Sequence, residues 1–313
     1  MPTEKLPTVF TFVPMNENTK NWQAVALFVL LALVWGSSFI LMKYGLQSFA
    51  YSQIGMIRVA LAFWFTFIIA FKRLRFLRKK DILPLLVVGL CGNAIPYMLF
   101  PLAVTKLDSG LVGILNSLVP LFTLIIGVIF YKTKVGLPSV IGILIGLAGA
   151  VWLLMPGVEI DPTKLKYGAL PIIATVCYAI SINTLSARLK HLDSLTITLL
   201  SLLFVGVPAT IYVFTTDFVH IMQTDDQAWM SLGYVAILGM VSSSLAVIIF
   251  NYLIKNTDPL FASSVTYLIP LVALIWGVLD GENIGLEHLF GMGAILLGVY
   301  VVNARRKYRE KKG

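Results

Sequence analysis

The stretch LVPLFTLIIGV at residues 118–128 returns as LIPLVALIWGV at residues 268–278. Each copy is an uncharged apolar run with a proline near its start. Proline removes a backbone donor and frees a carbonyl, so the pattern predicts apolar helices that are kinked at Pro120 and Pro270. We interpret the two prolines as hinges or cavity walls, with a static packing kink as the alternative.

The repetition extends beyond these two stretches. Residues 89–128 and 239–278 share 10 identities in 40 positions at a constant offset of 150, without a gap. Outside the proline stretches, the matched pairs are Gly89/Gly239, Phe100/Phe250 and Asp108/Asp258. An apolar composition inflates matches among Leu, Ile and Val, so the Asp, Pro, Gly and Phe pairs carry the argument. The chain is therefore predicted to contain an internal duplication.

The composition indicates a membrane protein. Of the 313 residues, 58% are hydrophobic and only 12% are charged, and the mean hydropathy is +0.88. A soluble domain typically carries about 25% charged residues. The only two cysteines, Cys91 and Cys177, lie inside apolar runs without metal-ligand spacing, and we interpret them as packing residues.

Apolar runs of membrane-spanning length occur throughout the chain. A helix needs about 20 apolar residues to cross the hydrocarbon core, and backbone groups in lipid must pair within the segment. The predicted fold is therefore all-α, with ten transmembrane helices. These spans are residues 22–43, 53–71, 82–104, 110–130, 137–155, 168–187, 194–214, 228–250, 259–279 and 286–304. The first span is too long for a signal-peptide core and is expected to be retained.

The duplication divides these ten helices into two repeats, at residues 22–156 and 157–304. Residues 1–21 are expected to form a poorly ordered N-terminal tail, and residues 305–313 a basic cytoplasmic tail. Five helices per repeat is an odd number, so the second repeat is expected to enter the membrane inverted. Inverted repeats recur in secondary transporters, where the substrate site lies near the midplane between them.

Basic residues predict the orientation. If the N-terminus is cytoplasmic, the inside segments hold 19 Lys or Arg residues and the outside segments hold four. This excess predicts that both termini are cytoplasmic, in a multi-pass protein of the inner or plasma membrane. The runs KRLRFLRKK (72–80) and RRKYREKK (305–312) flank helix ends, so we interpret them as topology signals and expect no nucleic-acid partner.

Several of these features together resemble one family. They are WGSSFILMK (35–43), Arg58 early in the second span, and the Pro120/Gly127 and Pro270/Gly277 helices. With the ten-helix duplication, they resemble the EamA family of the drug/metabolite transporter superfamily over nearly the whole chain. One departure is CYAISINTLSARLK (177–190), which only loosely echoes the first helix, so site residues cannot be mapped one-to-one between the halves.

The resemblance implies an exporter or exchanger of amino acids, their derivatives or other small metabolites. It also implies a central cavity lined by the first, third, fourth, sixth, eighth and ninth helices. Alternating access between the repeats would expose this cavity to each side in turn. Relatives in the superfamily carry nucleotide sugars or sugar phosphates, so these substrates and lipid-linked ones form the alternative.

Two basic residues are candidates for binding an anionic group. Arg58 lies in the second span and Lys43 lies near the outer end of the first. Intramembrane cations are costly and usually face a cavity or a partner, and the planar Arg fork suits a substrate carboxylate. The structural alternatives are snorkelling for Lys43 and, for Arg58, a pair with Asp108 or a backbone carbonyl.

Uncharged polar and aromatic residues are the remaining candidates for the cavity lining. Asn93 and Tyr97 are four apart and share a helix face. Trp and Tyr can stack on flat or cationic groups, whereas Ser and Asn in membrane helices can instead be packing contacts. The predicted substrate-binding set, besides Lys43 and Arg58, is Trp35, Ser38, Asn93, Tyr97, Asn116, Tyr178, Ser181, Ser243 and Tyr267.

Small residues indicate close helix packing. Gly142 and Gly146 form a GxxxG pattern, and Ala294 and Gly298 are spaced alike. Such pairs let helices approach closely, within the fold or between protomers of a homodimer. We expect internal packing, and a monomer or a homodimer.

Catalysis and cofactor chemistry are not expected. No Asp, Glu or His lies mid-span in a predicted helix: His191 and His220 fall in predicted loops, and His288 lies at the start of the last span. We therefore expect no enzyme activity, no metal, no cofactor, and no midplane proton relay built on carboxylates. Facilitated export or exchange, or coupling through Lys43 or an Asp at a helix end, stay as alternatives. A passive channel is a further rival function.

Overall fold

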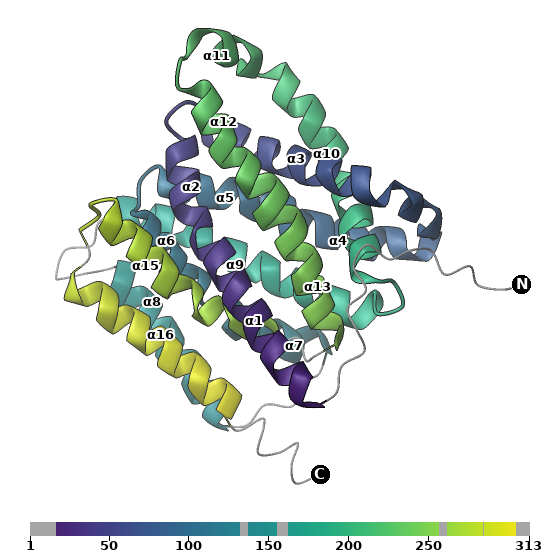
Figure 1. Cartoon of the computed structure of the whole chain (residues 1–313). Helices are drawn as coiled ribbons and strands as arrows, with labels where there is room; N and C mark the ends of the chain where they lie inside the picture. The colour runs from purple at the N-terminus through teal and green to yellow at the C-terminus, as the bar shows by residue number, and fades with distance from the viewer. Residues whose placement is uncertain (1–16, 132–136, 155–161, 257–261, 284, 305–313) are drawn as a thin grey trace, which may run out of the picture.

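The computed structural model of the protein describes residues 17–131, 137–154, 162–256, 262–283 and 285–304 (Figure 1). Every regular element among these residues is helical. The first half contains α1 (Glu17–Gly36), α2 (Ser38–Gly45), α3 (Tyr51–Ala70), η1 (Phe71–Phe76), η2 (Lys79–Asp81), α4 (Ile82–Gly89), η3 (Leu90–Ala94), α5 (Ile95–Val104), α6 (Ser109–Asn116), α7 (Val119–Tyr131) and α8 (Leu137–Leu154). The second half contains α9 (Pro162–Arg188), α10 (Ser194–Thr215), α11 (Phe218–Thr224), α12 (Ala228–Ile237), η4 (Leu238–Leu245), α13 (Ala246–Asn256), η5 (Ser264–Tyr267), α15 (Ile269–Leu279) and α16 (Leu286–Ala304).

Seven helical stretches of the described chain are long and apolar enough to cross a membrane. They are Ala26–Gly45, Tyr51–Phe76, Lys79–Val104, Ser109–Tyr131, Leu165–Arg188, Ser194–Thr215 and Ala228–Lys255. Three shorter apolar helices, Val140–Ala150, Val265–Leu279 and Leu286–Gly298, overlap the remaining predicted spans. The prediction of an all-helical membrane protein is confirmed. Most of the two predicted tails, residues 1–16 and 305–313, lies outside the described residues, although α1 already begins at Glu17.

The outer surface of the helices carries large apolar side chains. Ile68, Leu137, Trp229, Leu279 and Phe290 are each about 70% exposed. A water-soluble protein rarely exposes so many large apolar groups, but hydrocarbon solvates them well. This surface matches a lipid environment, while the buried polar side chains gather inside the bundle.

Three of the predicted spans are interrupted. The first breaks at Ser37, between α1 and α2. The fourth breaks between α6 and α7, and the ninth passes from the 3₁₀ segment η5 into α15. Pro120 and Pro270 lie in the first turns of α7 and α15 rather than within a continuous helix. Each proline lacks the donor for the carbonyl four residues earlier, which belongs to Asn116 and Thr266 respectively.

Two spans are loosened without breaking. The third contains the π-helical segment η3 between α4 and α5, and the eighth contains the π-helical segment η4 between α12 and α13. The repeat offset of 150 maps Leu90–Ala94 onto residues 240–244, which lie inside η4. π segments are rare in proteins, and those that occur often lie at functional sites. The two halves therefore share a backbone irregularity that the amino-acid pattern did not predict.

The small-residue motifs lie between α8 and α16, which run side by side (Figure 1). A Cβ atom at Gly298 would lie 2.5 Å from the backbone oxygen of Gly142 and 2.5 Å from the backbone nitrogen of Gly146. One at Gly149 would lie 2.9 Å from Cβ of Ala294. The predicted use of these residues for packing within the fold is confirmed.

Candidate functional site

A cavity of about 90 Å³ lies among the interrupted and loosened helices. All six helices that the family resemblance implied contribute to its wall, and α3 adds Arg58. Eight of the eleven predicted binding residues line it: Trp35, Ser38, Arg58, Asn93, Tyr97, Asn116, Tyr178 and Ser181. The helix breaks position several of them, because Trp35 and Ser38 flank the break at Ser37, and Asn116 ends α6.

Arg58 is the charged group of the cavity. It is 4% exposed, and its Nε donates a hydrogen bond of 2.6 Å to Oγ of Ser243. Its guanidinium carbon lies 3.7 Å from the centre of the Tyr97 ring. Among the described residues, neither terminal nitrogen of Arg58 has a hydrogen-bond partner, and no carboxylate pairs with it. The alternative of a pair with Asp108 is therefore wrong, and Arg58 lines the cavity without a carboxylate partner among the described residues.

The serine run at residues 242–244 in η4 anchors the helices around this cavity. Trp35 donates from Nε1 to the backbone oxygen of Ser242 at 3.0 Å, and Ser38 donates to its hydroxyl at 3.1 Å. Ser243 accepts from Arg58 and donates to the backbone oxygen of Leu238. Ser244 shares a hydrogen bond of 2.6 Å with the Thr66 hydroxyl. Consecutive side chains of a helix point in different directions, so the three serines reach different neighbours.

Two amide oxygens in the cavity wall have no partner among the described residues. They are Oδ1 of Asn93 and Oδ1 of Asn116, and both side chains are buried. Asn93 donates to the backbone oxygen of Val88 at 3.4 Å. A buried polar atom without a hydrogen bond costs about 1–3 kcal/mol, so both oxygens would gain from a hydrogen-bond donor that enters the cavity.

Aromatic and apolar side chains complete the wall. The Phe100 ring stacks on Tyr178 at 5.9 Å and meets Phe39 edge-on at 5.6 Å. Phe250 meets Trp35 edge-on at 5.0 Å. A mostly apolar wall with a few converging polar groups is typical of small-molecule sites.

Sequence reasoning missed several lining residues. Phe100, Phe250, Asn251 and Thr266 line the cavity but were not predicted. The repeat offset of 150 could have identified some of them. It aligns Phe100 with Phe250, and it aligns the predicted residue Asn116 with Thr266. Asn251 carried no such signal, and its amide donates to Oγ1 of Thr198 at 2.9 Å.

Three predicted residues do not line the cavity. Ser243 is fully buried behind Arg58 and bonds to it, which makes it a positioning residue. Tyr267 packs, partly buried, against the apolar core. Lys43 lies at one end of the bundle, in the cluster described next. In the described part of the chain, no three His, Cys, Asp or Glu side chains come together as metal ligands.

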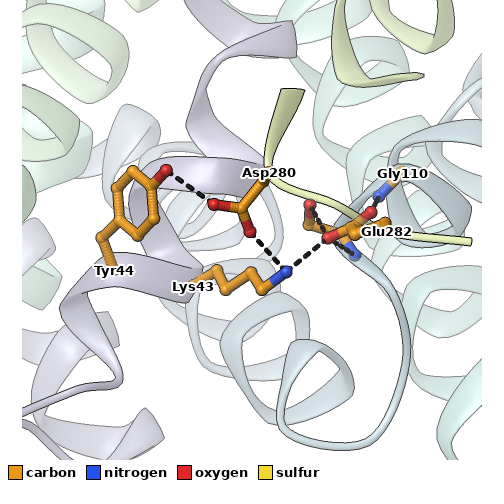
Figure 2. Close-up of polar contacts among 6 residues, drawn as sticks. Lys43, Tyr44, Gly110, Asp280 and Glu282 are labelled. Carbon is orange, nitrogen blue, oxygen red and sulfur yellow. Dashed lines mark hydrogen bonds and ion pairs between the residues drawn. The ribbon is translucent and has the colours of Figure 1, made fainter. Parts of the chain in front are cut away.

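Figure 2 shows Lys43 held between two carboxylates. Its Nζ lies 2.5 Å from Oδ2 of Asp280 and 3.0 Å from Oε1 of Glu282. Asp280 also accepts from the Tyr44 hydroxyl at 2.7 Å. Glu282 also accepts from the backbone nitrogens of Ser109 and Gly110 at 3.0 Å each, and from the Ser109 hydroxyl at 2.6 Å. Lys43 is thus ion-paired rather than snorkelling alone.

Both carboxylates of this cluster remain charged at neutral pH. Burial alone would raise the pKa of Glu282, but hydrogen bonds from Ser109, Gly110 and Lys43 outweigh it and hold that pKa below its ordinary value. The pKa of Asp280 is likewise lowered, because bonds from Lys43 and Tyr44 outweigh burial. A carboxylate whose pKa is lowered by folding stabilises the folded protein. This contribution is complete when the pH is above the ordinary pKa of about 4, and it is lost as the pH falls through the lowered pKa.

Asn116→Leu is expected to leave the melting temperature of the purified protein unchanged or higher, because it removes an unpaired buried oxygen. The same change should lower saturable flux about tenfold if that oxygen accepts from the substrate. Thermal unfolding and flux in proteoliposomes measure the two effects. Thr123→Val is the control, since Thr123 is buried in α7, its hydroxyl donates to the backbone oxygen of Val119 in the same helix, and it does not line the cavity. A lower melting temperature with normal flux would make Asn116 structural.

The chain is similar to several known transporters. The model of the EamA-like transporter family matches twice, at residues 22–155 and 166–304. An "Uncharacterized transporter" of Archaeoglobus fulgidus is 27% identical over 292 residues, which cover 92% of this chain and all of the relative. The "Uncharacterized inner membrane transporter YedA" of Escherichia coli K12 is 26% identical over 283 residues, covering 88% of this chain and 89% of the relative.

One solved structure has a fold similar to that of this chain. A crystal structure of a protein 15% identical in sequence superposes with a TM-score of 0.63, and the match covers 92% of this chain and 99% of that one. Together with the two matched segments of the family model, the likeness extends over nearly the whole described chain. The chain therefore belongs to the EamA-like transporter family and is a multi-pass membrane transporter.

Proposed function

We propose that the protein carries an amino acid or a closely related carboxylate-bearing metabolite across the plasma membrane, in the export direction, by alternating access. The observation that carries this proposal is that one cavity is lined by buried Arg58 and by Asn93 and Asn116, whose side-chain oxygens have no partner among the described residues. An unpaired guanidinium attracts a carboxylate, and amide oxygens accept from an ammonium group. A small zwitterion satisfies both poles at once.

The cavity size favours small substrates over the alternative ones. Pockets for drug-sized ligands measure roughly 300–1,000 Å³, whereas this cavity measures about 90 Å³. A nucleotide sugar or a lipid-linked sugar does not fit that space in this conformation. Stacked aromatic residues such as Phe100 and Tyr178 suit the apolar side chain of a small metabolite.

Alternating access follows from the two halves, which we propose are inverted five-helix repeats with both termini in the cytoplasm. The two matches of the family model and the π segments related by the offset of 150 support this arrangement. The helix breaks before Pro120 and Pro270 give each half a comparable hinge. Exchange of the two conformations between the halves would open the cavity to opposite sides in turn.

Counterflow in proteoliposomes tests the function. Vesicles loaded with an unlabelled amino acid are expected to take up the same labelled amino acid faster than empty vesicles, with saturation. Nucleotide sugars and sugar phosphates, tested in parallel, are expected to show no flux. Absence of saturable flux for every amino acid and small carboxylate tested would refute the proposal, and conductance without saturation would indicate a channel.

A further inference from the structure

We propose that Lys43, Asp280 and Glu282 form a latch that closes one end of the transport path and must open before the substrate can pass. We name these three residues, with Tyr44, Ser109 and Gly110, the latch cluster (Figure 2). The inference rests on the alternating-access function proposed above. It assigns the closing contact of one gate, which neither the cavity nor the family membership specifies.

Neighbouring residues of α2 connect the latch cluster to two hollows. Met42 lines the central cavity, and the adjacent Lys43 lines a second pocket of about 610 Å³. That second pocket is bordered by the α5–α6 connection and the start of α16. A substrate moving from the cavity to this pocket therefore passes the Lys43 side chain. Lys43 lies near the end of α2, and α3 begins soon afterwards at Tyr51. The basic run 72–80 follows the other end of α3, about 30 Å away for a 20-residue helix. The positive-inside rule assigns the latch to the outer face.

The latch cluster joins the two halves of the chain. Lys43 and Tyr44 come from α2, and Ser109 and Gly110 begin α6, all in the first half. Asp280 and Glu282 come from the α15–α16 connection in the second half. Every hydrogen bond and ion pair that joins these six residues to one another thus crosses between the halves. Movement of one half against the other must break these contacts.

Burial distinguishes this latch from ordinary surface ion pairs. The Glu282 side chain is only 2% exposed and accepts from four donors, two of them backbone amides at the start of α6. Bonds to charged groups are stronger than neutral ones, and losing one partner of a buried charge is strongly destabilising. An ion pair at the opposite end, Arg73–Asp193, also links the halves, but its Asp193 carboxylate is 47% exposed and lines neither hollow.

Access of a thiol reagent to the cavity tests the latch. The reporter is Ser38→Cys, in the cavity wall, placed in a background with Cys91→Ser and Cys177→Ser. Intact cells are treated with a membrane-impermeant methanethiosulfonate cation, and the labelling rate is measured. Glu282→Gln and Lys43→Gln are each expected to raise the rate at least tenfold, because the outer end then stays open for longer. Glu282→Asp keeps the charge on a shorter side chain, so its labelling rate should lie between the rates of these two variants and that of the parent.

Two control variants are matched to the latch changes. Asp226→Asn neutralises an exposed carboxylate before α12 that lines neither hollow, and Arg73→Gln breaks the cross-half pair at the other end. Both should label at the parent rate. Equal rates in the parent and both latch variants would overturn the proposal, as would an equal rise in the controls. Labelling requires no substrate, so the two proposals are tested separately. Unchanged labelling rates would overturn the latch but not the transport proposal, and absence of flux would overturn the transport proposal but not the labelling result.

Discussion

Arg58→Ala is expected to lower the saturable flux of a carboxylate-bearing substrate by about 10- to 150-fold, since a hydrogen bond to a charged group contributes roughly 1.5–3 kcal/mol. The structural reason is that the Arg58 guanidinium faces the cavity with no carboxylate partner among the described residues, so the substrate supplies the counter-charge. Counterflow of a labelled amino acid in proteoliposomes measures the loss. The protein must be quantified in each preparation, because a buried arginine also affects folding.

Conservative variants separate recognition from structure. Arg58→Lys keeps the charge but loses the planar fork, so it should restore flux only in part. Ser243→Ala removes the acceptor that orients Nε of Arg58. It should lower the flux of carboxylate-bearing substrates, although Arg58 keeps its positive charge. A matched pair of substrates, an amino acid and its neutral amide, completes the design. Equal loss of flux for both compounds in Arg58→Ala would show that the arginine serves packing rather than recognition.

Gly298→Ala is expected to destabilise the folded protein by about 1–3 kcal/mol, the usual cost of overpacking, because the added methyl meets backbone rather than a yielding side chain. Its Cβ would lie 2.5 Å from the oxygen of Gly142 and 2.9 Å from Cα of Gly146. The only relief is separation of α16 from α8, which opens the closest helix contact of this part of the bundle. Thermal unfolding of the purified protein in detergent measures the effect.

The same helix offers a control for this change. A Cβ at Gly293 meets nothing within 4 Å, so Gly293→Ala should be neutral or stabilising by roughly 0.5–1 kcal/mol through helix propensity. A similar melting temperature for both variants would contradict the close packing of α16 on α8. Dissociation of a dimer by Gly298→Ala, without loss of melting temperature, would instead assign the glycine to an interface between protomers.

The sequence determined the features that obey local rules. Lipid offers no backbone partners, so apolar length indicated the seven long helices and the three shorter ones. Small residues at helical spacing marked Gly142, Gly146 and Gly298 as packing residues. Proline lacks a backbone donor, and its repetition at the offset of 150 indicated interrupted helices at Pro120 and Pro270. Proline alone was not enough, because Pro101, Pro171 and Pro208 lie inside continuous helices. Most of the polar cavity lining followed as well, because an apolar span has few polar residues from which to choose.

The tertiary structure decided where the charges go. Arg58 bonds to Ser243, 185 positions later, and not to Asp108, while Lys43 pairs with Asp280 and Glu282 across more than 230 positions. No helical periodicity encodes such pairs, because they depend on how the two halves pack and on the register shift of the π segments. A single sequence gives the face on which a polar residue lies along its own helix, but only the packed bundle determines whether that face meets a cavity, another charge or lipid.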